Sequence, residues 1–203
     1  VVPGQLCLVS LAVPTMNYGR LRAIKTLKYC RRMLRLPRRL QAMRCERDLL
    51  MIVQDSFITD PKTLEQFVKQ ENWSDEFQEK TMWYPGWWVR EPENVWEQTI
   101  LTIWKDLISD TSKIQGIEYW LNVLPAGGDM QWHFDRDETA YERDKSIISP
   151  AIGSVYYPIP HQVRGGYLEM QDEVKEIERL APVFNRMVIF QSSNLHRVTP
   201  VYF

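Results

Sequence analysis

The sequence predicts an α+β fold in which helices come first and a series of short strands follows, arranged as a sandwich or a barrel. One observation is a helical repeat of apolar residues over 93–110, and the other is a set of short β-branched and aromatic runs after it. The chain has 203 residues, of which 44% are hydrophobic and 25% charged, as in ordinary globular domains. This composition excludes collagen-like, coiled-coil and wholly disordered chains, and no apolar run reaches the roughly 20 residues of a membrane helix.

The helical part of the prediction depends on spacing and on caps. A strand is expected over 49–53, and Asp60 followed by Pro61 is a typical helix start, which predicts a short helix over 61–70. The helix over 93–110 carries one apolar stripe, formed by Trp96, Ile100, Ile103, Trp104, Leu107 and Ile108. Such a stripe needs a broad apolar partner, and one face of a sheet would supply it.

The strands are predicted from alternating apolar runs that turn residues separate, such as Gly127-Gly128 and Gly165-Gly166. The expected strands are 117–124, 130–135, 151–157, 166–170, 186–191 and 195–201. The charged run over 136–145 is expected to be a solvated loop, placed where it can act as a lid.

The formal net charge of −1 averages two unlike segments. Residues 1–47 hold eleven Lys and Arg against one acid, Glu46, whereas residues 48–203 hold fourteen basic and twenty-five acidic residues. Cys7, Cys30 and Cys45 also lie in the first segment, and an odd number at one end is no disulfide framework. Residues 1–47 are therefore interpreted as a transit-like peptide, a membrane-surface helix, a nucleic-acid arm or a non-native extension before Met51.

The candidate chemistry lies in two of the three histidines. His133 and Asp135 alternate on a predicted strand, so their side chains can point to one side while Phe134 points to the other. His196 lies on another predicted strand. Two imidazoles and one carboxylate on adjacent strands can form a facial triad that binds Fe(II) and leaves three coordination positions open. His161, the third histidine, is expected to be a loop residue.

Three stretches, taken together, resemble the Fe(II)/2-oxoglutarate-dependent dioxygenases, especially their prolyl-hydroxylase-like branch. They are Trp132-His-Phe-Asp135, then Val155-Tyr-Tyr157 leading to Gly165-Gly-Tyr-Leu-Glu169, and Asn185–Phe190 leading to Leu195–Val201. The resemblance covers about residues 49–203. It implies a double-stranded β-helix, or jelly-roll, with flanking helices on one sheet.

The resemblance also implies the site and the reaction. His133, Asp135 and His196 would be the iron ligands, and Tyr157 matches a position that touches 2-oxoglutarate. Fe(II), 2-oxoglutarate and O₂ would be required, with ascorbate as a further candidate. The expected reaction hydroxylates an unactivated C–H bond and releases succinate and CO₂. The substrate stays open among protein prolyl residues, free amino acids and small metabolites.

One departure from the family concerns the basic residue that anchors the far carboxylate of 2-oxoglutarate. The family carries it on the last strand, and this chain stops at Phe203, before that position. We therefore expect residues 48–203 to be a dioxygenase domain that lacks its last strand, with the anchor beyond Phe203.

Two other functions are considered beside the hydroxylase. A catalytically silent jelly-roll binding module would explain the missing anchor, although the intact triad disfavours it. A nucleic-acid demethylase of the same superfamily would bind phosphates through the basic residues 1–47. The acidic residues 48–203 disfavour a nucleic-acid partner, because both would be negatively charged. We expect a cytoplasmic location, unless the basic segment acts as a transit peptide.

Overall fold

The computed structural model describes residues 6–13, 51–73, 80–105, 111, 114–150, 152–171 and 175–203. All the Lys and Arg residues of the basic segment 1–47 lie outside these residues, as does the end of the predicted helix 93–110. In the described part, no helix combines the length and the apolar character needed to cross a membrane.

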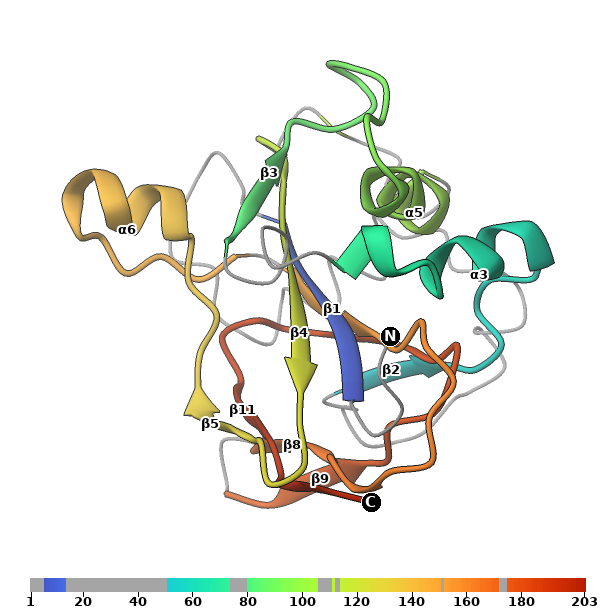
Figure 1. Cartoon of the computed structure of the whole chain (residues 1–203). Coiled ribbons are helices and arrows are strands. Elements are labelled where there is room, and N and C mark those ends of the chain that lie inside the picture. Colours follow the sequence, from blue (N-terminus) through green and yellow to red (C-terminus); the bar gives the residue numbers. More distant parts are fainter. Residues whose placement is uncertain are drawn as a thin grey trace.

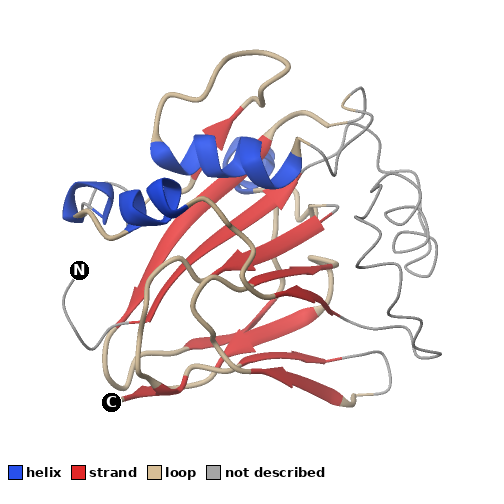
Figure 2. Ribbon diagram, turned by 90° about the vertical axis from the view of Figure 1, so that its right-hand side faces the viewer, coloured by secondary structure: helices blue, strands red, loops and turns tan. Residues whose placement is uncertain are grey.

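Most of the structure consists of two antiparallel sheets and a short two-stranded one (Figures 1 and 2). The larger sheet has the order β2 (Met51–Gln54), β10 (Met187–Phe190), β6 (Ile152–Tyr156), β1 (Leu6–Val13), β4 (Ile117–Leu124) and β3 (Met82–Tyr84). The four-stranded sheet has the order β5 (Met130–His133), β11 (Leu195–Val198), β8 (Leu168–Gln171) and β9 (Ile177–Leu180). The two-stranded sheet pairs β12 (Val201–Tyr202) with β7 (Arg164–Gly165).

The chain crosses repeatedly between the two main sheets. It passes from β4 to β5, back to β6, across to β8 and β9, back to β10 and across again to β11. Such winding of antiparallel strands is that of a double-sheet jelly-roll. The predicted α+β double-stranded β-helix is therefore confirmed.

The N-terminal strand β1 occupies the middle of the larger sheet. It pairs with β4 from Leu6↔Leu124 to Ala12↔Glu118, and with β6 from Val9↔Tyr156 to Val13↔Ile152. Of the strands between which the chain crosses, β4, β6 and β10 lie in the larger sheet and β5, β8, β9 and β11 in the smaller one. β1 adds a fourth strand to the first group by lying between β4 and β6. This strand was not predicted from the sequence. The division of the chain at residue 48 stays a prediction, although residues 6–13 lie inside the sheet.

Two apolar clusters hold the layers together. The inner core lies between the sheets, because it combines Val155, Val188 and Phe190 of the larger sheet with Leu168 and Val198 of the smaller. The outer core packs helices α3 (Pro61–Phe67) and α5 (Val95–Trp104) against the opposite face of the larger sheet. Figure 2 shows the helices covering that sheet, as predicted.

The caps explain where the helices begin. The Asp60 carboxylate accepts hydrogen bonds from the backbone N–H groups of Lys62 and Thr63, and Pro61 fills the first helical position. The Asn94 side chain accepts from Trp96 and Glu97 in the same way, so α5 begins at Val95 and not at residue 93.

Part of the charged run after Asp135 is helical, which corrects the expectation of a loop. Helix α6 (Glu138–Asp144) begins after Asp137, whose carboxylate accepts from the Ala140 N–H at 2.7 Å. The helix ends at Lys145, whose backbone is left-handed with φ of 62°. The polar composition of this segment predicted a loop, but the hydrogen bond from Ala140 to the Asp137 side chain starts a short helix.

Candidate metal centre

The two histidines lie opposite each other on neighbouring strands. β5 pairs with β11, and His133 is the direct partner of His196. The next pair is Val198↔Met130, so the chain advances two residues on β11 but three on β5. The extra residue on β5 is a β-bulge. The imidazole centroids are 4.3 Å apart, so the predicted meeting of these strands is found in the structure.

Each imidazole is oriented by a backbone carbonyl two residues before it. His133 Nδ1 lies 2.7 Å from the Gln131 carbonyl oxygen, and His196 Nδ1 lies 2.8 Å from that of Asn194. A carbonyl can only accept, so these contacts assign the proton to Nδ1 and leave the Nε2 lone pair free to bind a metal.

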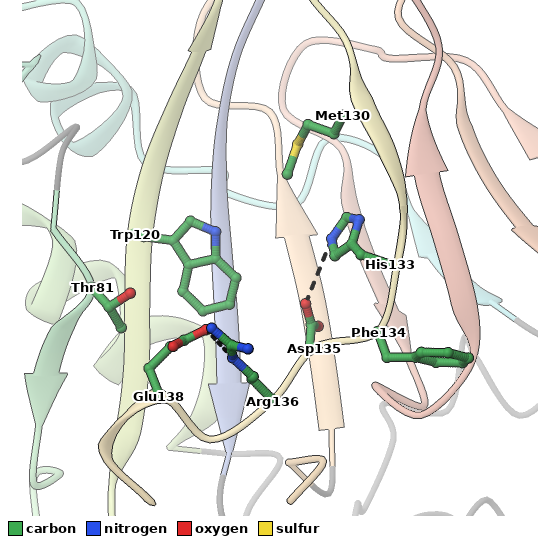
Figure 3. A pocket seen from close by; sticks show the side chains of 8 residues that line it. All are labelled: Thr81, Trp120, Met130, His133, Phe134, Asp135, Arg136 and Glu138. Atoms are coloured by element: carbon green, nitrogen blue, oxygen red, sulfur yellow. Dashed lines mark hydrogen bonds and ion pairs between the residues drawn. The ribbon is translucent and has the colours of Figure 1, made fainter. Parts of the chain in front are cut away.

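Asp135 completes the group from the residues just after β5. Its Oδ1 lies 3.5 Å from His196 Nε2 and 4.0 Å from His133 Nε2. One ligand atom from each of the three residues lies within 4.8 Å of the others. In Figure 3, His133 and Asp135 face each other while Phe134 points away, as strand alternation predicts.

The surroundings of the group favour a bound cation. Asp135 and His196 are buried, and the recorded ion-pair partners of Asp135 in the described chain are the two imidazoles. A buried carboxylate is costly without a compensating charge, and neutral imidazoles supply none. Burial and the nearby His196 lower the pKa of His133 below its usual value of 6.5, which keeps the ring neutral and able to ligate.

A cavity of about 370 Å³ opens beside these ligands (Figure 3), a size typical of small-molecule sites. Its lining is Thr81, Trp120, Met130, His133, Phe134, Asp135, Arg136 and Glu138. Trp120, Met130 and Phe134 are apolar, and Arg136 is the one basic residue in this described lining. The Arg136 side chain bonds Glu138 and lies over the Tyr141 ring.

Tyr157 does not line this cavity. It follows β6, is fully buried in the inner core, and its hydroxyl has no hydrogen-bond partner among the described residues. Burial raises the pKa of this hydroxyl, so it stays protonated and could donate a hydrogen bond to an acceptor. Met130 touches both regions, since it lines the cavity and packs against the inner core.

Trp120, Gly153 and Phe190 lie near the three candidate ligands and were not predicted from the sequence as site residues. A glycine inside a strand pattern is a signal for close approach of a neighbour, and this signal was present at Gly153. Trp120 and Phe190 looked like ordinary core residues. His161 lies outside the metal group, as expected.

Comparison with known proteins is informative for the part of the chain that carries this site. Residues 119–202 match the family model described as the 2OG-Fe(II) oxygenase superfamily. No curated protein sequence matches the chain. Among solved structures, a prolyl hydroxylase from Trichoplax adhaerens, in complex with a hypoxia inducible factor oxygen degradation domain peptide fragment, is similar. It has 15% sequence identity and a TM-score of 0.49, covering 90% of this chain and 89% of that one.

Proposed function

We propose that this chain, whose residues 119–202 match the 2OG-Fe(II) oxygenase superfamily, hydroxylates an unactivated C–H bond of its substrate. Fe(II), 2-oxoglutarate and O₂ are the cofactor set of this family. The hydroxylase reaction would be prolyl-hydroxylase-like and would release succinate and CO₂. The observation that carries the proposal is the meeting of His133, Asp135 and His196 inside the matched residues 119–202.

The donor set suits Fe(II). Two imidazoles with free Nε2 atoms and one carboxylate can occupy one face of the ion and leave the other face open. When bound there, Fe(II) together with 2-oxoglutarate and O₂ supplies the oxidising chemistry. The protein residues bind and orient: the two backbone carbonyls hold the imidazoles, and Trp120 and Met130 provide an apolar wall that limits the entry of water.

A contact between Tyr157 and 2-oxoglutarate stays a prediction, because Tyr157 does not line the cavity. Its buried hydroxyl has no acceptor among the described residues, which costs about 1–3 kcal/mol, and a carboxylate oxygen that reached it would supply one. No basic residue among the described ones is assigned as the anchor of that carboxylate. Arg136 is not assigned that role, because its guanidinium is already held at the rim by Glu138 and Tyr141.

The test begins with the unmodified protein under anaerobic conditions. Adding 2-oxoglutarate to the Fe(II)-loaded protein should produce a metal-to-ligand charge-transfer band, and a chelator should remove it. With O₂ and substrate candidates present, succinate release should need Fe(II). A band without turnover of any prolyl peptide, amino acid or small metabolite would favour the binding module, and the absence of a band would contradict the proposed function.

Metal binding should also depend on pH with a defined sign. Only neutral imidazole ligates, and the pKa of His133 lies below 6.5, so protons begin to compete with the metal only below that pH. Titrations with Co(II) should give a constant affinity above about pH 7 and a loss of about tenfold per pH unit once His133 is protonated in acid. An affinity that rises on acidification would show that the histidines are not the ligands.

A further inference from the structure

Gly153 lies at a point where a side chain would not fit. A Cβ atom built there would be 2.6 Å from Phe190 Cε2 and 3.0 Å from Asp135 Oδ2. The first distance is far below ordinary van der Waals contact, so the Phe190 ring occupies space that any other residue at 153 would fill. The absence of a side chain at Gly153 thus lets a candidate metal ligand lie in the space that a Cβ would border.

Phe190 links Gly153 to a second ligand. The two residues are direct partners across β10 and β6. The Phe190 ring also packs against the His196 imidazole, with ring centroids 4.9 Å apart and planes tilted by 58°. Both side chains are about 5% exposed or less, so neither ring has free space in which to turn.

The two oxygens of Asp135 are divided between two neighbours. Oδ1 is the atom near His133 Nε2 and His196 Nε2, and Oδ2 is the atom that a Cβ at residue 153 would contact. Added bulk at residue 153 would therefore press on the carboxylate from the side opposite the imidazoles. The carboxylate would have to rotate or shift, and the Phe190 ring would have to move with it.

We propose that Gly153 and Phe190 are positioning residues of the metal centre, a role that rests on the proposed function because it assumes an ion held by His133, Asp135 and His196. Gly153 leaves the space in which Asp135 presents Oδ1 to the ion. The Phe190 ring, seated across Gly153, supports the imidazole of His196. Neither residue is among the candidate ligands, so both would act through His196 and Asp135.

The first test is Gly153→Ala, measured by anaerobic titration with Co(II), whose visible absorption reports ligand geometry. The variant should fold, should bind Co(II) roughly 10- to 100-fold more weakly than the unmodified protein, and should give an altered spectrum, as changes to the surroundings of ligands commonly do. The matched control is Gly127→Ala, where a Cβ meets nothing within 4 Å. Because Gly127 has φ of +79°, this control should melt earlier but bind Co(II) with unchanged affinity and spectrum.

Phe190→Leu provides an independent measurement if Gly153→Ala does not fold. Leucine keeps an apolar side chain in the core but removes the ring from His196, so Co(II) affinity should again fall. In the double variant, the smaller side chain at 190 should relieve part of the clash at 153, so the two losses should not add.

The outcomes separate the two claims. Unmodified protein that binds neither Fe(II) nor Co(II) would contradict the proposed function and the positioning role with it. If the unmodified protein binds metal and both folded single variants bind it with the same affinity and spectrum, the positioning role alone is wrong.

Discussion

Replacing His133 by alanine should abolish iron-dependent succinate release and the charge-transfer band with 2-oxoglutarate. The change removes one of the three candidate ligands. Replacing a residue that merely orients a ligand already weakens metal binding about 10- to 100-fold. Metal affinity should therefore fall by more than about 100-fold here. His133 lines the cavity and is partly exposed, so the fold should survive. Metal titration and circular dichroism on the same sample separate loss of the site from loss of the structure.

His161→Ala is the matched control for this experiment. It removes the same imidazole from a residue that lies outside the metal group. The control should keep metal affinity, the charge-transfer band and turnover. Retention of all three by His133→Ala would falsify the assignment of this histidine as a ligand.

Replacing Ser10 by proline should strongly destabilise the protein. Ser10 lies in β1 and pairs with Trp120 on one side and Val155 on the other, so its backbone is in the middle of the larger sheet. Proline removes a ladder hydrogen bond, does not fit a central strand and leaves a carbonyl of a neighbouring strand without its donor, at a cost of at least about 1–3 kcal/mol. At roughly 2–4 °C per kcal/mol for a chain of this length, the melting temperature should fall by several degrees.

Ser10→Ala is the control, because it keeps the backbone N–H and removes only a hydroxyl group. We expect Ser10→Ala to melt close to the unmodified protein and Ser10→Pro to melt well below it. Since Trp120 lines the cavity, Ser10→Pro should also weaken Co(II) binding. Equal melting temperatures for both variants would show that β1 does not hold the centre of this sheet.

Several local features of the fold could be read from residue order. Asp60 and Asn94 cap the helices that follow them, and the apolar stripe from Trp96 to Trp104 lies buried against the sheet. These features depend on neighbours within a few residues, so spacing and capping chemistry suffice to predict them. The charged run after Asp135 was misjudged because its composition suited a loop, whereas Asp137 caps a short helix there.

The strand position of β1 could not be predicted in the same way. Residues 6–13 form an apolar run whose local pattern does not identify a partner, and the strands that flank it lie more than a hundred residues further on. Partner choice in a sheet is a long-range matter, decided by which edges are left unpaired once the other strands have packed.

For the candidate metal centre, the sequence by itself determined which residues can ligate. His133 and Asp135 alternate along a predicted strand, which turns both side chains to one side even though β5 ends at His133, and His196 follows in a second strand. Only the tertiary structure decided that His196 pairs with His133, that Asp135 presents Oδ1 to both imidazoles, and that Phe190 lies across Gly153. The physical reason is that the pleat is a property of the local backbone, whereas the space around a carboxylate depends on packing between strands that are far apart in the chain.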